Sequence, residues 1–171
     1  MPTIGFDQHD HTHCKKHAML AAENRCAKAK LQFTPVRKRV LEILLEKHMA
    51  LGAYDILPLL AADGLGSQPP VVYRALDFLV SNGLAHRIER LNAYTACSHL
   101  DHAHAPAFLI CRSCRTVAEA DTGLEQGRLG AIAKQTGFTI ERMVIEAEGL
   151  CPTCAGANTG ANTGANIEAS A

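Results

Sequence analysis

The sequence predicts an α+β fold in two parts: an N-terminal winged helix-turn-helix and a small C-terminal α/β unit. Apolar residues recur with a helical period of about 3.6 residues up to Ser81-Asn82-Gly83, and from Leu84 they alternate with polar residues, as strand residues do. Farther along, two Cys-x-x-Cys pairs, Cys111/Cys114 and Cys151/Cys154, bracket a short mixed segment. The change of period and the paired cysteines divide the chain into these two parts.

Four helices are expected in the first part. Residues 15–31 are rich in Ala, Lys and Glu, which favour a helix. Thr34-Pro35 begins a second helix, because Thr is a preferred N-cap and Pro fits the first helical position. A third helix covers residues 53–62. The fourth begins at Pro69-Pro70 and ends before Gly83, a preferred residue just beyond a helix.

Two short strands follow the helices. Leu84–Arg90 and Ala93–Cys97 are the strands, and Asn92 supplies the turn between them. Helices followed by a two-stranded ribbon form a winged helix-turn-helix, in which the fourth helix is the recognition helix and the ribbon is the wing. We therefore expect the first part to be a DNA-binding domain.

The second part is predicted to contain strands and one helix. The strands are expected at 107–111, 116–120 and 138–147, and the helix at 123–136. A unit of about 45 residues is small for an independent core. A bound metal and a second copy of the chain would both stabilise it, so we expect a dimerisation domain and a homodimer.

The predicted boundaries define five segments. They are a flexible His-rich tail at 1–14, the winged-helix domain at 15–97, a hinge at 98–106, the dimerisation and zinc-binding domain at 107–155, and a disordered tail at 156–171. The last segment repeats Ala-Asn-Thr-Gly, which is a low-complexity pattern.

Composition limits the possible functions. The net charge is zero, but residues 15–90 carry twelve Lys or Arg and seven Asp or Glu, whereas residues 91–171 carry five and eight. A basic first half favours nucleic-acid binding. No apolar run approaches the roughly 18 residues that span a membrane. The polar N-terminus and the odd cysteine count lead us to expect a cytoplasmic protein without a membrane partner.

The two cysteine pairs predict a structural zinc site. Cys111, Cys114, Cys151 and Cys154 can place four thiolates around one tetrahedral ion, a geometry that suits Zn2+. The 36 residues between the pairs leave room for a small folded unit. The alternative is two local disulfides or four unrelated thiols.

Three residues are expected to contact DNA. Tyr73 and Arg74 stand among the early residues of the recognition helix, with Val71 and Val72, where side chains reach the major groove. Tyr54 begins the preceding helix, whose positive end favours phosphate. Alternatively, the tyrosines are half-buried core residues and Arg74 is a solvated charge. Residues 37–39, Arg-Lys-Arg, are either a phosphate-facing stripe or a solvated one.

A second metal site is expected at the hinge. His86, Cys97, His104 and Glu119 supply two imidazoles, a thiolate and a carboxylate, a set that suits Zn2+ and draws on both parts of the chain. The alternative makes Cys97 a small buried apolar residue and His86 an ordinary surface histidine.

Other polar residues offer weaker metal sites. His99, Asp101 and His102 form a further candidate set or could replace one of the four hinge ligands. The tail residues His9, His11, His13, Cys14 and His17 either capture metal or belong to a flexible polar arm.

Residues 15–155 resemble the ferric uptake regulator (Fur) superfamily, and most closely its zinc-sensing branch. The resemblance rests on Phe33–Arg39, Ala53–Leu57, Pro69–Leu79, Cys111-x-x-Cys114 and Val144–Cys154. It implies a structural role for the four paired cysteines, a regulatory role for His86, Cys97, His104 and Glu119, and DNA contacts by Tyr54 and Arg74.

Two departures from the family pattern stand out. Val71 replaces the Thr that is common in the zinc-sensing branch, so a hydroxyl–phosphate contact is lost. Ala105–Phe108 separates the histidines from the first cysteine pair, unlike the compact His run of the iron-sensing branch, which counts against iron sensing.

The resemblance implies a homodimeric repressor of zinc-uptake genes that binds double-stranded operator DNA when Zn2+ occupies the hinge, with two Zn2+ per chain. The alternatives are a Fur-family sensor of another metal or of peroxide, and a zinc-storage or zinc-delivery protein. Enzyme activity is not expected, because four protein ligands leave no open position on the hinge metal.

Overall fold

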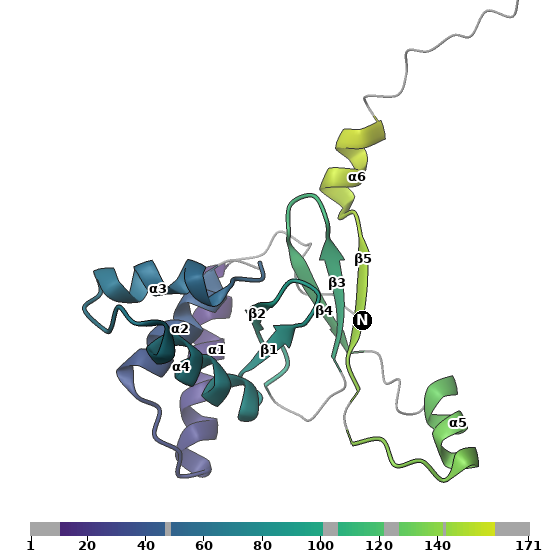
Figure 1. Cartoon of the computed structure of the whole chain (residues 1–171), viewed down its shortest axis with the longest axis horizontal. Helices are drawn as coiled ribbons and strands as arrows, with labels where there is room; N and C mark the ends of the chain where they lie inside the picture. The colour runs from purple at the N-terminus through teal and green to yellow at the C-terminus, as the bar shows by residue number, and fades with distance from the viewer. Residues whose placement is uncertain (1–10, 47–48, 101–105, 122–126, 142, 160–171) are drawn as a thin grey trace, which may run out of the picture.

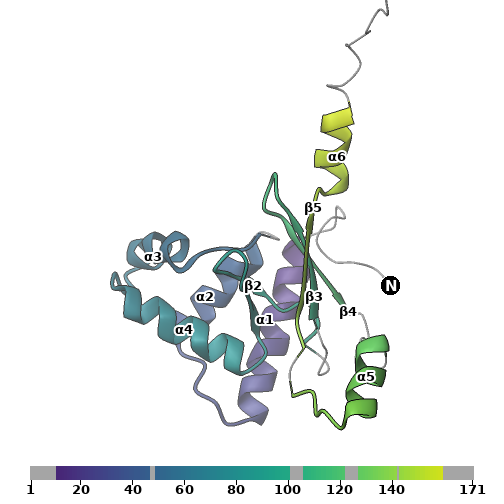
Figure 2. The same cartoon turned by 45° about the vertical axis from the view of Figure 1, so that its right-hand side comes forward.

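The computed structural model describes residues 11–46, 49–100, 106–121, 127–141 and 143–159. Helices form one half of the molecule and a three-stranded sheet lies in the other, with a two-stranded hairpin between them (Figures 1 and 2). The predicted α+β class is confirmed, with N-terminal helices and a hairpin followed by an α/β part that carries a four-cysteine cluster.

The helical half contains α1 (His11–Lys28), α2 (Pro35–Glu46), α3 (Ala53–Ala62) and α4 (Pro69–Ser81). Helix α1 begins within the segment that was predicted to be a flexible tail, and residues 1–10 of that tail lie outside the described residues. Gly83 follows α4 with a φ of 66°. The Leu84 N–H donates to the Leu79 carbonyl at 2.8 Å, as in the glycine-terminated helix ends that the sequence predicted.

One apolar core joins the four helices to the hairpin. Each helix contributes fully buried residues, among them Ala22, Leu41, Ile56 and Leu76. Burying each large aliphatic side chain contributes about 1.5–3 kcal/mol relative to leaving it exposed. This core fixes the start of α4, the helix predicted to read DNA.

The hairpin pairs β1 (Ala85–Ile88) with β2 (Ala93–Ala96) in antiparallel register. Asn92 lies in the turn with a φ of 45°, a left-handed conformation that Asn tolerates. The strands are shorter than predicted because Glu89 and Arg90 belong to the turn.

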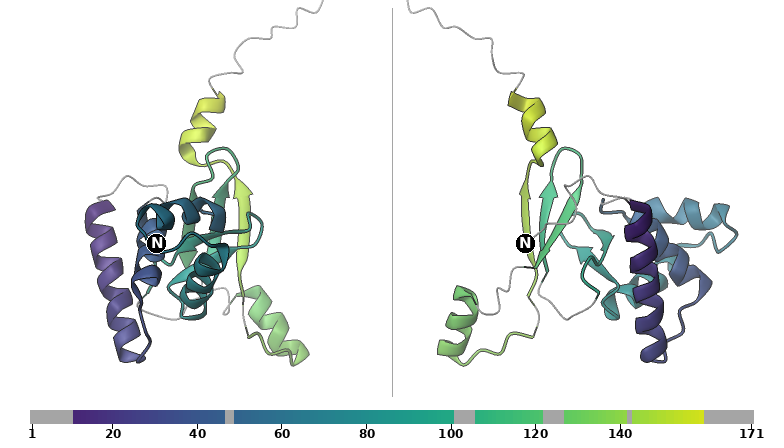
Figure 3. Two further views of the ribbon diagram at one scale, coloured as in Figure 1. Left: turned by 60° about the vertical axis from the view of Figure 1, so that its left-hand side comes forward. Right: turned by 180° about the vertical axis from the view of Figure 1, so that it is seen from behind.

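The C-terminal sheet has the order β4-β3-β5, with β3 (Pro106–Cys111) between β4 (Val117–Asp121) and β5 (Ile145–Gly149). Strand β3 is antiparallel to β4 and parallel to β5. Helix α5 (Arg128–Thr136) precedes β5 and stands away from the sheet (Figure 3), while α6 (Pro152–Thr159) follows it.

Two predictions about these elements were wrong. The last strand was expected at 138–147, but it begins at Ile145, since its pairing with β3 runs from Ala107↔Ile145 to Cys111↔Gly149. Residues 156–159 were expected to be disordered, but they belong to α6. The predicted helix at 123–136 is observed from Arg128, and residues 122–126 lie outside the described part.

A second core joins the hairpin to the sheet. Its buried members come from β1, β2, β3, β4 and the segment before α3: Ala50, Ile88, Ala93, Phe108, Ile110 and Val117. Since these residues come from both parts of the chain, the hairpin is packed against the sheet and does not project freely into solvent.

Candidate metal centres and recognition helix

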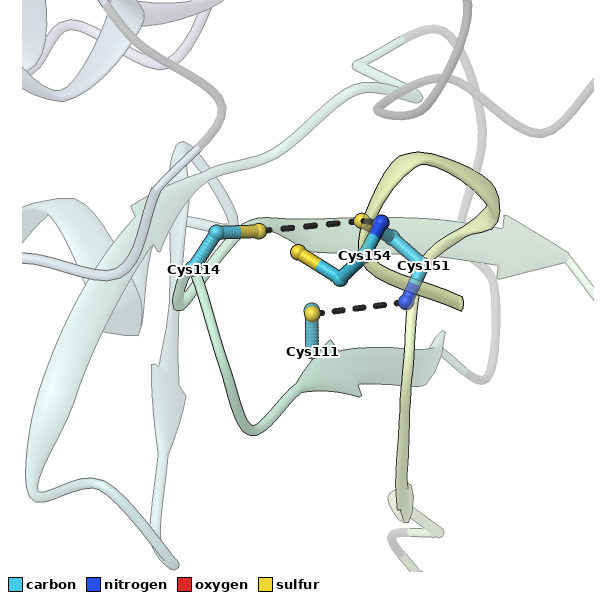
Figure 4. A group of neighbouring side chains, drawn as sticks. All are labelled: Cys111, Cys114, Cys151 and Cys154. Carbon is cyan, nitrogen blue, oxygen red and sulfur yellow. Dashed lines mark hydrogen bonds between the residues drawn. The ribbon is translucent and has the colours of Figure 1, made fainter. Parts of the chain in front are cut away.

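Four cysteine sulfurs converge at one end of the C-terminal sheet (Figure 4). Cys111 ends β3 and Cys151 follows β5, so the parallel pairing of the two strands brings the two cysteine pairs together. All four sulfurs lie within 4.8 Å of one another, and none forms a disulfide. The spacing of the pairs therefore produces the predicted cluster, and the disulfide alternative is not observed.

The sulfur geometry fits a zinc ion. The Sγ atoms of Cys114 and Cys151 are 3.7 Å apart. Four Zn–S bonds of about 2.3 Å give a tetrahedron whose edges are about 3.8 Å. Because the cysteines alone already approach this geometry, the cluster can accept a tetrahedral ion with little movement.

Hydrogen bonds favour a thiolate in this cluster. Backbone N–H groups of Cys114 and Cys151 lower the pKa of the Cys111 thiol to about 6. A hydrogen bond with Ser113 lowers the pKa of Cys154, but neighbouring Cys151 and burial outweigh it and raise that pKa to about 12. A cluster that favours the thiolate form of Cys111 is suited to bind a thiophilic cation.

A second group of possible ligands lies where the hairpin meets the sheet. His86 of β1, Cys97 after β2 and Glu119 of β4 place their ligand atoms within 4.8 Å of one another. Glu119 Oε1 is 3.0 Å from His86 Nε2 and 4.0 Å from Cys97 Sγ. His104, the fourth predicted ligand, lies outside the described residues. The structure thus brings together three of the four residues predicted at the hinge.

Burial makes this second group electrostatically unusual. Glu119 and Cys97 are each 3% exposed. Burial, and then the charge of Glu119, raise the pKa of the Cys97 thiol to about 12. Two adjacent buried anions are costly, whereas a divalent cation between them would compensate both charges. The chemistry of these donors therefore fits a metal ion.

The surroundings of Glu119 include groups that the sequence alone did not identify. The Ser98 N–H donates to Glu119 Oε2 at 2.7 Å. The ring of Phe108, which is opposite Glu119 in the strand register, lies 5.3 Å from the His86 ring. Strand β3 is apolar along its whole length, so no alternation in the sequence marks Phe108 as the residue that faces His86. These contacts orient two of the possible ligands.

His99 lies beside the same carboxylate. Its Nδ1 is 3.9 Å from Glu119 Oε1, and its side chain is 22% exposed. Asp101 and His102, the other members of that weaker set, lie outside the described residues, as does His9 of the N-terminal tail. His99 therefore remains an alternative imidazole at the hinge.

The three residues predicted to contact DNA are all exposed. Tyr54 at the start of α3 is 70% exposed, Tyr73 is 38% exposed, and Arg74 is exposed on α4. Val72 is fully buried, so it belongs to the core and not to the groove-facing side of the helix. Exposure leaves the two tyrosines and Arg74 accessible to a phosphate or a base edge.

The basic run at 37–39 is engaged within the chain. Arg37 stacks on the Phe78 ring at 3.7 Å from its centroid, and Lys38 Nζ is 2.7 Å from Glu23 Oε1. Arg39 makes ion pairs with Asp63, Glu42 and Glu46. These contacts support the solvated-stripe interpretation over a phosphate-facing one.

Comparisons with known proteins agree on one family. The model of the ferric uptake regulator family matches residues 28–148. A zinc uptake regulation protein of Escherichia coli (strain K12) is 38% identical over 134 residues, which cover 78% of each chain.

Two solved structures are also similar. A zinc uptake regulator complexed with zinc and DNA is 35% identical, with a TM-score of 0.80 over 85% of this chain and 97% of that one. Holo XcZur is 35% identical, with a TM-score of 0.73 over 83% of this chain and 99% of that one. In the described part of the chain, no helix is long and apolar enough to cross a bilayer.

Proposed function

This chain belongs to the ferric uptake regulator family, and from that premise we propose that it is a zinc-responsive repressor of zinc-uptake genes. The family consists of metal-responsive, DNA-binding transcription regulators, so the protein is not an enzyme. The zinc-specific part of the proposal is supported by the similarity to zinc uptake regulators and by the donor atoms at the hinge.

The observation that carries the proposal is the group formed by His86, Cys97 and Glu119. These residues come from β1, the end of β2 and β4, so they connect the helical half to the C-terminal sheet. A thiolate among the ligands favours Zn2+ over ions that prefer oxygen donors. Zinc binding to these three residues would change how the helical half and the C-terminal sheet are held together.

His86 and Cys97 would hold the hairpin, and Glu119 would hold the sheet, around one ion. Zinc, when bound, supplies the positive charge that lets Cys97 lose its proton beside the Glu119 carboxylate. His104 is the proposed fourth ligand. Closing this contact fixes the direction of α4, because β1 follows α4 within a few residues.

The four-cysteine cluster is proposed to hold a second, structural zinc. It joins the ends of β3 and β5 and lies within the smaller half, where it would stabilise the sheet. The protein would therefore carry two zinc ions per chain, of which one is retained and one exchanges with the cytoplasmic pool.

Dimerisation is proposed through the C-terminal half. Strands β4 and β5 are the edges of the described sheet. Helix α5, which stands away from the sheet, exposes large apolar residues, Leu129 at 51% and Ile132 at 50%, with Phe138 following at 69%. Exposed apolar residues in such a cluster favour a protein partner. A homodimer would present two α4 helices to half-sites one helical turn apart, about 34–36 Å.

A DNA-binding titration tests the proposal. Fluorescence anisotropy with DNA from a promoter of zinc-uptake genes should show binding that tightens about 5- to 150-fold when zinc is added to the dialysed protein. A chelator should reverse the effect. Equal affinity with and without zinc, or the same response to iron or manganese alone, would contradict zinc-dependent repression. Zinc binding without any DNA binding would instead favour a storage or delivery protein.

A further inference from the structure

The hairpin touches the C-terminal sheet at two separate places. At its base, Cys97 and His86 approach Glu119 of β4. At its tip, the turn after β1 contacts β5, which is the opposite edge strand of the same sheet. The hairpin therefore crosses the sheet from one edge to the other, with Phe108 of the central strand in the core beneath it.

The contacts at the tip are made by two carboxylates of β5. Glu146 accepts hydrogen bonds from the backbone N–H groups of Glu89 at 2.8 Å and of Arg90 at 3.0 Å. Glu148 binds the Arg90 guanidinium through two bonds, from Nε at 2.6 Å and from Nη2 at 3.1 Å. Both carboxylates bind Arg90, and Glu146 also binds Glu89, so the position and the orientation of the tip are restrained together.

The contact between Arg90 and Glu148 is strongly directional. Bidentate pairing matches the planar guanidinium to the carboxylate, and hydrogen bonds to a charged acceptor are stronger than neutral ones. The pairing raises the pKa of Arg90 and lowers the pKa of Glu148, so both groups keep their charges. No metal ligand takes part, since the two possible metal groups of the described chain use other residues.

We propose that Arg90, Glu146 and Glu148 form a wing-tip clamp that positions the DNA-reading half against the C-terminal sheet independently of the hinge metal. The proposal rests on the proposed function only for its effect on DNA binding. The clamp holds the tip of the hairpin in place. When zinc binds at the hinge, the base of the hairpin therefore closes on the sheet while the tip stays fixed. The three residues are thus positioning residues for α4.

The clamp has a consequence for the wing itself. The charge of Arg90 is matched by Glu148, and its backbone N–H is bound to Glu146. This part of the hairpin therefore connects the two halves of the chain instead of offering a free cation to DNA phosphate.

Amide hydrogen exchange tests the clamp without reference to DNA. In dialysed protein with no added zinc, the N–H groups of Glu89 and Arg90 should be protected. Glu146→Ala should accelerate their exchange by about tenfold or more. Glu89→Gln is the matched control, because Glu89 pairs with Arg87 through its side chain and reaches β5 only through its backbone. Equal exchange in wild type and Glu146→Ala would overturn the clamp.

The zinc requirement for DNA binding supplies the second readout. Glu148→Gln should raise the zinc concentration for half-maximal DNA binding by roughly 2- to 30-fold, the range for residues that modulate coupling between sites. Removing a negative charge from the protein would by itself strengthen DNA binding. A higher zinc requirement in Glu148→Gln therefore cannot come from the change in net charge. Glu89→Gln, which removes the same charge nearby, should show only the general effect.

A charge exchange separates the ion pair from other roles of these residues. Arg90→Glu combined with Glu148→Arg keeps the net charge and should restore much of the wild-type zinc response that either single variant loses. If the double variant is no better than the single ones, the pair does not position α4. If wild-type protein binds no DNA while the amide protection is present, the proposed function fails and the clamp stands.

Discussion

Among single residues, Cys97 and Glu119 are the two whose burial and charge most clearly indicate a function. Both are almost fully buried, and the thiol loses access to its charged form because burial and Glu119 oppose it. Such a pair is poorly suited to a purely structural core, where an apolar residue would pack at lower cost. A cation is the partner that makes both residues favourable.

Single Cys→Ser substitutions distinguish the hinge group from the four-cysteine cluster. Cys97→Ser should leave folding and the dimer intact and remove most of the gain in DNA affinity produced by zinc, which is typically about 5- to 150-fold. Cys114→Ser should instead lower the thermal midpoint and weaken the dimer. Gel filtration, thermal melts and anisotropy measure these outcomes.

Cys26→Ser is the matched control for these variants, since Cys26 is a 2% exposed thiol in the helical core and belongs to neither group. It should lower stability without changing the zinc response. If Cys97→Ser and Cys114→Ser behave alike, the division into a sensing site and a structural site is wrong.

The affinity of the hinge site for zinc should fall as the pH falls. The pKa of Cys97 is raised to about 12, so the thiol is protonated at neutral pH and must release a proton on binding zinc. One released proton lowers the affinity by about tenfold for each unit of pH below that pKa. Calorimetry in buffers with different ionisation enthalpies counts the protons. No proton release near neutral pH would exclude Cys97 as a ligand.

Local spacing explains which residues the sequence could identify. The first cysteine pair flanks a tight turn and the second lies at the start of α6. Their convergence needs only one strand pairing, Cys111↔Gly149. The contact of Glu119 with His86 depends on how the hairpin packs on the sheet, so the sequence predicted these residues only as members of one hinge metal site. Arg37 stacks on Phe78 of α4, and Arg39 pairs with Asp63 just beyond α3, so no local pattern could choose between phosphate and protein contacts for them.

At the scale of elements, α4 is the predicted recognition helix. One side of it is fixed in the helical core through Val72 and Leu76, while Tyr73 and Arg74 remain accessible. Its end is set by Gly83, whose positive φ turns the chain directly into β1. The predicted recognition helix is therefore continuous with the strand that bears His86.

Substituting Arg74 should show whether its guanidinium contacts a base edge or a phosphate. A guanidinium that bonds a guanine edge in two places contributes about 1–3 kcal/mol of discrimination. Arg74→Ala should weaken specific binding by the corresponding factor, and Arg74→Lys should restore little of it. Arg74 is exposed, so the thermal midpoint should stay unchanged.

Arg115→Ala is a control that removes an exposed Arg from a turn of the C-terminal half, away from the recognition helix. It should have little effect on sequence preference. If Arg74→Ala weakens binding to all DNA sequences equally, Arg74 contacts phosphate and not a base.

The helices and the hairpin were predictable because each carries its own periodic pattern and end signals. The last strand was not. The described residues between 138 and 144 have strand-like composition but pair with no strand in the described part of the chain, and β5 begins only where β3 can pair with it. The extension of α1 to His11 was missed because polar histidines give no helical apolar period.

At the scale of the whole molecule, two halves are joined by a hairpin with contacts at both ends. The base of the hairpin bears possible metal ligands, and the tip is held by carboxylates of β5. In the proposed mechanism, a change at the base redirects α4 without separating the halves. In the proposed homodimer, the same change alters the relative placement of two recognition helices.

The affinity of zinc for the hinge site, measured with and without operator DNA, tests this account most directly. Binding free energies are reciprocal, so operator DNA must tighten zinc binding by the same factor, about 5- to 150-fold, by which zinc tightens DNA binding. Competition with a fluorescent zinc chelator gives the two zinc affinities on one protein sample. Equal factors in the two titrations are the predicted result, and a zinc affinity that operator DNA leaves unchanged would contradict the account.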